Sequence, residues 1–557
     1  MTIRGDARVT CTPSRYNDRR MKSETRFHIF LAFLALAGSF MVYLATSGYG
    51  AGLSTDGARY LSTAENIAGG LGVIDYLGLP LINWPPLYPI LLAALNWLTG
   101  LDVFILGQWV NILAFGGIIW FGGIFFERSL PGNWAFAALA SLVLATSLPL
   151  IEVSANIASD PIFMVCTLLF LLAAQDYLHT RSQKSWLQMA ALAIVSSFLR
   201  YAGVALVISG ALIMLVANLP MKQSSQRTWG LPRFPFTSFR VARNGWPAAA
   251  FVAAAGVPIG AWILFHNYRL TGSILGSHLP ANPIGNFVAG LSKAFSWFVP
   301  ETILRTAPPL LLAAALLVLL AVRSNRKRWR TWWRRVQVAA ILPAAIFFAV
   351  YGAMLIFAIS YPEHRVPGSQ RIHIVILPAL LVLATITAQE FLPKISKAKQ
   401  LTWRNVTLAV FGLWLLFPLY RVQVYVRASM QNGDVSYYNL YNTRTLRESD
   451  IVQYIQSMNF DESEKVYSNN EGAAWFYLHR RIYRLPRYDA VTGQSLQNVM
   501  RDFDGWPAPD ELATLIWFKR DLDYKELVPT PEQMQQFIRL TPIYTGRYGI
   551  VYLMDVD

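Results

Sequence analysis

Long apolar runs dominate the chain and are separated by short polar segments. A helix needs about 20 mostly apolar residues to cross the hydrocarbon core of a bilayer. Runs of this kind predict about eleven transmembrane helices, at about 27–46, 103–126, 134–151, 161–178, 186–199, 202–219, 246–266, 304–322, 337–358, 372–388 and 405–420. The pattern therefore predicts an α-helical polytopic membrane protein.

The pair 186–199 and 202–219 leaves the count open, because the first of these runs is short. One long kinked helix over both runs would invert the topology of everything after it. Two separate helices preserve the alternation of basic and charge-poor loops described next, so we expect two.

Lys and Arg residues gather on alternate loops, and this asymmetry predicts the orientation. They crowd the tail 1–26 and recur at 128, 181–184, 222–243, 323–335 and 394–404. The segment 47–102 has only Arg59, and 152–160 has no basic residue. The N-terminus is therefore expected in the cytoplasm and the C-terminal segment outside, with the bacterial inner membrane as the expected compartment.

Composition supports the membrane assignment. Of 557 residues, 54% are hydrophobic and 14% are charged, whereas soluble domains carry about 25% charged residues. The net charge of +16 would suggest nucleic acid in a soluble protein, but here the basic residues lie in same-side loops. The two cysteines, Cys11 and Cys166, predict neither a disulfide framework nor a cysteine metal site.

Two outer segments are too long to be simple connections. Segment 47–102 contains Leu53–Gly70, a plausible surface helix, and Pro86–Leu98, an apolar helix too short to span. We therefore divide the chain into a basic tail, 1–26, a transmembrane catalytic domain, 27–420, and an extracytoplasmic domain, 421–557.

The last segment has ordinary polar composition and is expected to form a small α/β domain. Its patterns predict helices at Leu446–Met458 and Pro531–Leu540 and strands at Lys465–Ser468, Thr514–Phe518 and Gly549–Met554. It has no GxGxxG or P-loop motif for nucleotides. A lid or a surface that recognises the acceptor is the expected role.

Charged residues at the outer membrane edge are the candidate chemical groups, because burying a charge there is costly. They are Asp56, Glu152, Asp160, Arg200, His266, Arg269, Arg365 and Arg371, with Tyr201 beside Arg200. A carboxylate can deprotonate an acceptor hydroxyl, and arginines can neutralise a leaving phosphate. The set therefore suits transfer from an anionic, phosphate-linked donor.

Several of these residues also have purely structural interpretations. Asp160 precedes Pro161 as a helix-capping residue would. Arg269 and Arg365 are placed where arginines commonly extend to the interface.

Four motifs resemble the integral-membrane C-type glycosyltransferases, especially the protein O-mannosyltransferases and lipid A aminoarabinose transferases. They are the stretch Asp56-Gly57-Ala58-Arg59-Tyr60, the stretch from Gly78-Leu79-Pro80 to Trp84-Pro85-Pro86-Leu87-Tyr88-Pro89, the tripeptide Ser159-Asp160-Pro161, and Gln370-Arg371 leading to Pro378. The resemblance implies a polyprenyl-phosphate sugar as donor and Asp56 as the catalytic base, with inversion at the anomeric carbon.

The same resemblance makes Asp160 the second catalytic candidate and Arg371 the first candidate for the donor phosphate. Arg200, Arg59 and Arg269 are further phosphate candidates, and Glu152, Tyr60 and Tyr88 are other candidates at the site. The implied acceptor is a hydroxyl of a lipid, a glycan or a protein.

Two departures limit what the resemblance implies. Gly57 stands where many relatives have Glu, and Trp84 stands where the aminoarabinose transferases have Lys. That particular donor and acceptor are therefore not expected. Neither of the outer loops that carry Asp56 and Asp160 contains an Asp-x-Asp pair, so a required metal is not predicted there. A divalent ion held jointly by Asp56 and Asp160 stays open.

Two other classes of function remain. A transporter or lipid flippase would be expected to show internal repeats and charges at mid-bilayer, whereas these charges lie at one edge. A structural or sensor protein would use the outer domain to bind a partner, and Asp56→Asn would then leave its function intact.

Overall fold

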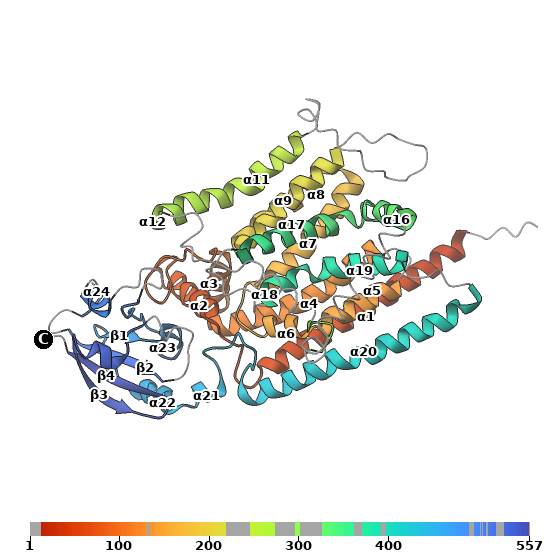
Figure 1. Cartoon of the computed structure of the whole chain (residues 1–557). Helices are drawn as coiled ribbons and strands as arrows, with labels where there is room; N and C mark the ends of the chain where they lie inside the picture. The colour runs from red at the N-terminus through yellow and green to blue at the C-terminus, as the bar shows by residue number, and fades with distance from the viewer. Residues whose placement is uncertain are drawn as a thin grey trace, which may run out of the picture.

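The structure, a computed structural model, describes residues 13–130, 134–218, 245–272, 294, 296–300, 326–360, 370–391, 397–488, 495–501, 503, 505–507, 511–519 and 528–555. A bundle of long helices carries a small sheet at one end (Figure 1). The predicted span 304–322 and the candidate Arg365 lie outside the described residues.

The bundle follows the predicted apolar runs closely. Its helices are α1 (Pro13–Thr46), α4 (Val103–Ser129), α5 (Trp134–Ala145), α6 (Leu148–Ser154), α7 (Asp160–Thr180), α8 (Gln183–Leu199), α9 (Val204–Asn218), α11 (Trp246–Trp262), α12 (Arg269–Thr271), α16 (Arg326–Val336), α17 (Leu342–Ser360), α18 (Gln370–His373), α19 (Leu377–Phe391) and α20 (Lys397–Asn432). A π-helical turn, Ile263–Tyr268, joins α11 to α12.

Six helices in the described residues are long and apolar enough to cross a membrane, or seven if α5 and α6, bent by 52°, form one span. Three shorter apolar helices are Leu87–Thr99, Tyr201–Ala217 and Leu342–Ala358. The prediction of a polytopic helical membrane protein is confirmed. The predicted number of eleven spans is not confirmed by these lengths.

The predicted break between 186–199 and 202–219 is present. Arg200 ends α8 with extended backbone angles, φ −151° and ψ 138°, and a 3-10 turn, Tyr201–Gly203, leads into α9. An added Cβ on Gly203 would lie 2.3 Å from the backbone of Ser196, so the turn folds tightly against the end of α8. The two runs therefore form two packed helices.

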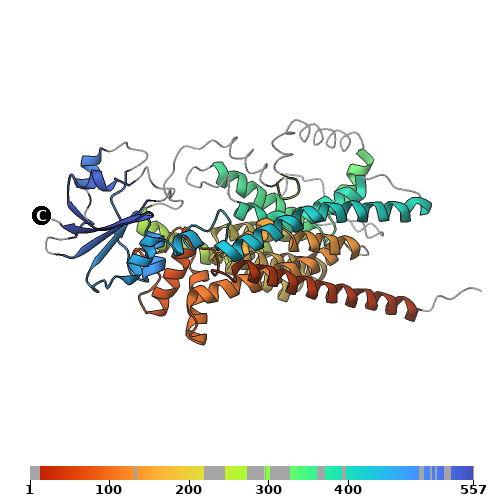
Figure 2. The same ribbon diagram turned by 90° about the horizontal axis from the view of Figure 1, so that it is seen from below.

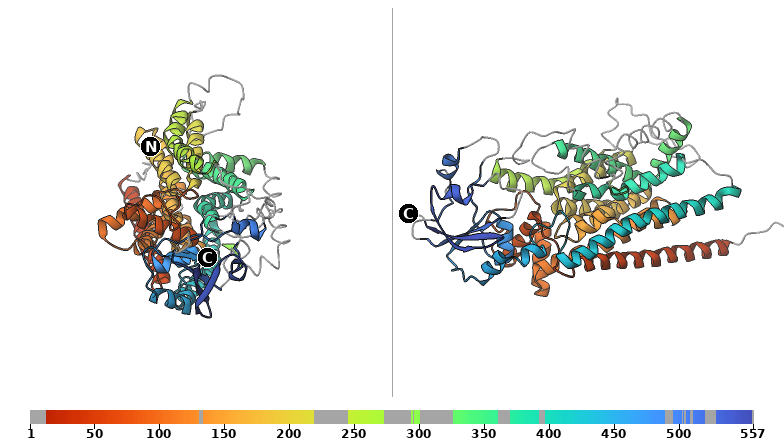
Figure 3. Two further views of the ribbon diagram at one scale, coloured as in Figure 1. Left: turned by 90° about the vertical axis from the view of Figure 1, so that its left-hand side faces the viewer. Right: turned by 60° about the horizontal axis from the view of Figure 1, so that its bottom comes forward.

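The two ends of the bundle differ. The N-terminal helix α1 begins at the end far from the sheet and runs toward it beside α20 (Figures 1 and 3). The basic helix α16 lies at the same far end, and the view from below shows the sheet beyond the opposite end (Figure 2). The start of α1 and the basic helix α16 thus lie opposite the sheet, while the orientation in a membrane and the outer position of the sheet stay predictions.

The first long loop contains both predicted short helices, α2 (Thr55–Ala68) and α3 (Leu87–Thr99). Ser54 caps α2 by accepting a hydrogen bond from the backbone of Gly57 at 3.2 Å. A Cβ at Gly57 would lie 2.8 Å from the carbonyl oxygen of Ile157. The start of α2 therefore approaches the loop that contains Ile157 so closely that there is little room for a side chain at position 57.

The C-terminal sheet has the order β1-β2-β4-β3. Strands β1 (Lys465–Ser468) and β2 (Ala513–Phe518) are parallel, and β4 (Gly549–Asp555) pairs antiparallel with β2 and with β3 (Arg539–Thr545). Helices α21 (Arg444–Arg447), α22 (Asp450–Ser457), α23 (Glu471–Leu478), α24 (Leu496–Arg501) and α25 (Pro531–Met534) complete the domain. The three predicted strands are confirmed.

The helix predicted at Pro531–Leu540 is wrong in its second half. Helix α25 ends at Met534, and the edge strand β3 begins at Arg539. Pro542 obscured this strand in the sequence, since proline within a strand is tolerated mainly at edges and bulges, and a bulge falls between Pro542 and Tyr544. The predicted helix Leu446–Met458 is divided between α21 and α22.

The C-terminal segment is hydrogen-bonded to the chain just before α2. The carbonyl of Leu53 accepts from the backbone of Leu440 and Tyr441, at 2.9 and 3.1 Å. The side chain of Asn442 donates to the carbonyls of Tyr49 and Ala51 at 2.7 and 2.8 Å. The start of α2 is therefore positioned by residues almost 400 positions later in the chain.

Candidate active site

Four charged side chains from four helix ends are joined by ion pairs. Helix α2, which carries the first of them, lies at the end of the bundle nearest the sheet (Figure 1). Asp56 lies in the first turn of α2, Asp160 begins α7, Arg200 caps the end of α8, and Arg371 is the second residue of α18. The helix ends bring together residues that span 315 positions.

Arg371 lies between the two carboxylates. Its Nη2 atom is 2.5 Å from Oδ2 of Asp56, and its Nε atom is 3.1 Å from Oδ2 of Asp160. Arg200 Nη1 is 2.5 Å from the same oxygen of Asp160. Two carboxylates and two guanidinium groups thus form one cluster, which we call the Arg371 cluster.

The members of the Arg371 cluster differ in their access to solvent. The side chain of Asp160 is fully buried, and those of Arg371, Arg200 and Asp56 are 11%, 15% and 24% exposed. Because a buried carboxylate needs compensating charge, Asp160 is suited to holding the two arginines in place. Asp56 is the more accessible of the two carboxylates.

Electrostatics keep Asp56 ionised. Burial alone raises the pKa of this carboxyl, but the charge and hydrogen bond of Arg371 more than offset the effect, so the pKa is lowered. Trp84 also contributes a side-chain hydrogen bond to Asp56. The ionised form of Asp56 is therefore favoured while Arg371 is paired with it.

The local backbone fixes Arg371. Its amide N–H donates to the hydroxyl of Tyr438 at 3.2 Å, and Tyr351 donates to the carbonyl of Ile372 at 3.0 Å. A 3-10 segment, Ile374–Ile376, separates α18 from α19, whose second residue is Pro378. Pro378 has no amide N–H to donate to the carbonyl of Ile374, four residues earlier, which accounts for the 3-10 segment there. This segment separates the short turn that carries Arg371 from α19.

Tyr60 and Tyr88 are buried packing partners beside the cluster. Their rings meet edge to face with centroids 5.1 Å apart. The Tyr60 hydroxyl is 3.2 Å from Ser159 Oγ, and Tyr88 donates to Asn111 at 3.4 Å. These contacts place α2 against the start of α7, which sets the spacing of Asp56 and Asp160.

Arg59 is occupied by a different partner. Its guanidinium forms an ion pair with Asp75, whose side chain is fully buried, and lies 5.4 Å from the ring of Tyr76 and 5.1 Å from that of Trp84. Asp75 also accepts from the backbone of Leu77 and Leu79, closing a turn of the first loop. In the structure, Arg59 therefore has a role in holding the turn of the first loop through Asp75. A contact between Arg59 and a donor phosphate stays a prediction.

The remaining candidate residues form no ion pair with Arg371 in the described part of the chain. Glu152 lies in α6, and Arg269 lies in α12 with an exposed side chain. Tyr201 donates to the carbonyl of Ile82 at 2.9 Å, and the His266 ring stacks on Trp262 with centroids 4.1 Å apart. Their roles at the site stay predictions.

No group of three or more His, Cys, Asp and Glu side chains suited to a metal ion occurs in the described ranges. The guanidinium of Arg371 occupies the position between Asp56 and Asp160. A shared divalent ion would have to displace it.

Sequence analysis missed several residues that position the site. Tyr438 contacts Arg371, and the Tyr441 hydroxyl is 2.9 Å from Thr55 Oγ1, beside Asp56. Asn156 donates to buried Asp434 at 2.6 Å, which ties the loop before Asp160 to the end of α20. These contacts link distant segments, and no local pattern signals them.

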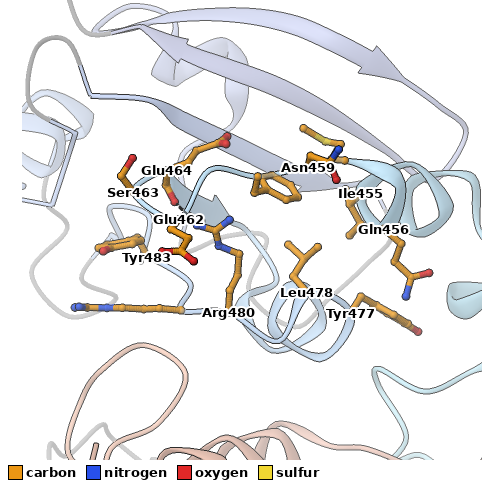
Figure 4. Close-up of a pocket in the computed structure, with 13 residues that line it drawn as sticks. Ile455, Gln456, Asn459, Glu462, Ser463, Glu464, Tyr477, Leu478, Arg480 and Tyr483 are labelled. Atoms are coloured by element: carbon orange, nitrogen blue, oxygen red, sulfur yellow. Dashed lines mark hydrogen bonds between the residues drawn. The ribbon is translucent and has the colours of Figure 1, made fainter. Parts of the chain in front are cut away.

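The C-terminal domain also contains a cavity of about 750 Å³ between the end of α22 and the end of α23 (Figure 4). Arg480 crosses it and donates to the carbonyl of Glu464 at 2.6 Å. Tyr477, in its wall, donates to the carbonyl of Tyr441 at 2.8 Å. The cavity is therefore connected to the start of α2 through Tyr441 but is distinct from the Arg371 cluster.

Comparison with protein family models and with curated protein sequences finds no match. Among solved structures, the chain is similar to ArnT from Cupriavidus metallidurans in the apo state, with 14% identity and a TM-score of 0.53 over 94% of this chain and 97% of that one. A second ArnT structure, bound to undecaprenyl phosphate, gives the same values. The archaeal oligosaccharyltransferase AglB from Archaeoglobus fulgidus, in complex with an inhibitory peptide and a dolichol-phosphate, matches at 10% identity and a TM-score of 0.48, over 89% of this chain and 70% of that one.

The similarity to ArnT extends over nearly the whole length of both chains. The protein thus has the fold of the integral-membrane C-type glycosyltransferases, with a small C-terminal sheet. The resemblance inferred from the motifs is confirmed at the level of the fold, and the chain is an integral membrane protein.

Proposed function

We propose that the protein is an inverting glycosyltransferase. It moves a sugar from a polyprenyl-phosphate donor to an acceptor hydroxyl at the outer face of the membrane. The observation that carries the proposal is the Arg371 cluster, which joins a reachable carboxylate, Asp56, to guanidinium groups at one end of the bundle. ArnT, which has a similar fold, was solved with undecaprenyl phosphate, a lipid phosphate of the proposed kind.

Asp56 is the proposed general base. It takes the proton of the acceptor hydroxyl while the acceptor oxygen forms a bond to the anomeric carbon. The bond between that carbon and the phosphate oxygen breaks on the opposite face, and its electron pair leaves with polyprenyl phosphate. The configuration at the anomeric carbon is therefore inverted.

Arg371 and Arg200 are the proposed phosphate ligands. The donor phosphodiester carries one negative charge, and the leaving phosphate monoester carries two. Asp56 loses its charge as the phosphate gains one, so the total charge of the site is conserved during the step. Guanidinium groups near the leaving oxygen stabilise the charge as it moves there.

The exchange of partners by Arg371 couples donor binding to activation of the base. While Arg371 stays on Asp56, the carboxylate is a weak base because its pKa is lowered. When a donor phosphate competes for the guanidinium, Asp56 loses its cation and becomes more basic. Arg200 remains paired with Asp160 at 2.5 Å, which holds that carboxylate when Arg371 shifts.

The proposed division of the chain follows from this arrangement. Residues 27–420 form the transmembrane catalytic domain, and 421–557 form an outer domain that braces α2 and contacts the acceptor. The hydrogen bonds of Leu440 and Tyr441 to Leu53 support the bracing role.

The test is transfer by purified protein offered a panel of radiolabelled polyprenyl-phosphate sugars and membrane extract. Asp56→Asn is expected to lower turnover about 100-fold or more, as loss of a general base does. Asp102→Asn is the matched control, because Asp102 is an exposed carboxylate that caps α4 and Asn also caps helices. Equal turnover by wild type and Asp56→Asn would overturn the base assignment, and absence of turnover and donor binding across the panel would favour a transporter.

A further inference from the structure

Helix α16 has an unusual composition. Its sequence, Arg326-Lys-Arg-Trp-Arg-Thr-Trp-Trp-Arg-Arg-Val336, contains six basic residues, three tryptophans and no acidic residue. A helix that combines basic and aromatic residues in this way is suited to the interface between lipid head groups and acyl chains. Its contacts determine which residues are available there.

One side of α16 packs on α19. The indole N–H of Trp332 donates to Thr387 Oγ1 at 2.9 Å. Arg335 donates to the side chain of Gln389 at 2.8 Å and lies 3.6 Å from the Glu390 carboxylate. These contacts fix the rotation of α16 against the bundle.

The other side presents two parallel rows. Trp329 and Trp333, four positions apart, are 45% and 44% exposed. Arg330 and Arg334, also four positions apart, are exposed beside them. Residues four apart lie on the same helix face, so an aromatic row runs next to a cationic row.

The aromatic row is held rigidly. The rings of Trp329 and Trp332 stack with centroids 4.7 Å apart, and those of Trp332 and Trp333 lie 6.0 Å apart. Because Trp332 is itself hydrogen-bonded to α19, it connects both exposed rings to the bundle.

The helix lies where a membrane surface is expected. It precedes the apolar helix α17 and is found at the end of the bundle where α1 begins, opposite the sheet (Figures 1 and 2). Tryptophan is enriched at the level of lipid head groups. Exposed arginines at that level attract anionic lipids.

We propose that this face of α16 binds anionic phospholipid head groups in the leaflet at the N-terminal end of the bundle. Arg330 and Arg334 pair with the lipid phosphates, while Trp329 and Trp333 insert between the glycerol and upper acyl regions. Charge complementarity selects the occupant, since the helix has no acidic residue and an anionic lipid supplies the opposite charge. The proposal is independent of the transferase chemistry at the other end.

The test compares lipids that stay bound to the purified full chain, measured by native mass spectrometry after equilibration with equimolar phosphatidylglycerol and phosphatidylcholine. Wild type is expected to retain phosphatidylglycerol preferentially. The double variant Arg330→Gln/Arg334→Gln is expected to lower that preference at least threefold. The matched control, Arg444→Gln/Arg539→Gln, removes two exposed arginines near the sheet and is expected to match wild type.

Two further double variants and a competition experiment separate the contribution of charge from that of the tryptophans and from binding of free phosphate. Arg330→Lys/Arg334→Lys keeps the charge and is expected to keep most of the preference, whereas Trp329→Ala/Trp333→Ala is expected to lower retention of both lipids. Adding inorganic phosphate at millimolar concentration is expected to leave phosphatidylglycerol bound. Unchanged selectivity in the arginine-to-glutamine variant, an equal loss in the control, or displacement by inorganic phosphate would overturn the proposal.

Discussion

The Nη2 atom of Arg371 lies 2.5 Å from Oδ2 of Asp56, although the two residues are 315 positions apart. The pair joins the first loop to the turn before α19, and the Nε atom of the same guanidinium lies 3.1 Å from Oδ2 of Asp160 in a second ion pair. Arg371 therefore lowers the pKa of Asp56, and its own guanidinium is held on the other side by the ion pair with Asp160. In the proposed reaction, the donor phosphate competes with Asp56 for the guanidinium of Arg371.

Arg371→Gln should change the pH dependence of transfer as well as the affinity for donor. Arg371 lowers the pKa of Asp56, while burial raises it. Removing the cation leaves burial, so the pKa rises. Because the base acts only when ionised, the acidic limb of kcat/KM against pH should move to higher pH, and the KM for donor should increase.

The pH profile of Arg371→Gln is best compared with that of Arg447→Gln, which removes an exposed arginine of α21. The acidic limb of kcat/KM against pH should be unchanged from wild type in the control. An Arg371→Gln enzyme with the wild-type limb and the wild-type donor KM would show that Arg371 acts on neither Asp56 nor the donor.

Arg59→Gln should affect stability more than donor binding. The Asp75 side chain is fully buried, and Arg59 is its ion-pair partner. Removing one member of a buried pair typically costs about 3–5 kcal/mol because a buried charge loses its compensation. The backbone amides of Leu77 and Leu79 still donate hydrogen bonds to Asp75 and partly compensate its charge. The loss in free energy of unfolding should therefore be close to the lower value, about 3 kcal/mol.

Thermal unfolding in detergent and the donor KM distinguish the two roles of Arg59. The double variant Arg59→Gln/Asp75→Asn should recover much of the lost stability, because no charge is then left unpaired. If Arg59→Gln unfolds at the wild-type temperature but its donor KM rises several-fold, Arg59 is a phosphate ligand, as the sequence suggested.

The apolar runs and short motifs predicted most of the bundle because each is encoded locally. The short helices α2 and α3 and the break at Arg200 lie where the sequence pattern predicts them. The 3-10 segment before Pro378 was not predicted, because the apolar run 372–388 indicated one continuous span. Asp56 and Arg371 were singled out separately, and only the fold brings them into contact. Their pairing depends on the packing of α2, α7 and α18, which no single stretch of sequence specifies.

Arg59 and the strand β3 show the limits of such prediction. Arg59 has the charge expected of a phosphate ligand, but its partner, Asp75, is buried by the fold of the first loop and carries no sequence signal. In β3, no strand was predicted, and Pro542 is accommodated because β3 is an edge strand with a bulge before Tyr544. Neither outcome follows from local propensity.

Tyr441→Phe tests whether the C-terminal segment positions the base. The Tyr441 hydroxyl lies 2.9 Å from Thr55 Oγ1, at the residue before Asp56. Loss of this hydrogen bond should lower stability by about 1 kcal/mol and reduce kcat several-fold with little change in donor KM. Steady-state kinetics with Tyr437→Phe, an exposed tyrosine nearby in sequence, as control checks this; equal kcat values would show that the contact does not position Asp56.

Gly57→Ala should disturb the site although it adds one methyl group. The new Cβ would lie 2.8 Å from the carbonyl oxygen of Ile157 and 2.9 Å from Leu53 Cδ1. The backbone oxygen belongs to the loop before Asp160 and cannot rotate away, so α2 must shift. Overpacking of this kind typically costs about 1–3 kcal/mol, and a shift of α2 would also lengthen the contact between Asp56 and Arg371.

Gly69→Ala is the matched substitution at the other end of the same helix. Gly69 has φ −80°, and an added Cβ there would meet its nearest neighbour, Glu65 O, at 3.4 Å. Thermal unfolding and transfer rates should therefore be near wild type for Gly69→Ala and clearly reduced for Gly57→Ala. If both variants are equally stable and active, the approach of α2 to Ile157 does not set the position of Asp56, and the Gly at position 57 needs another explanation.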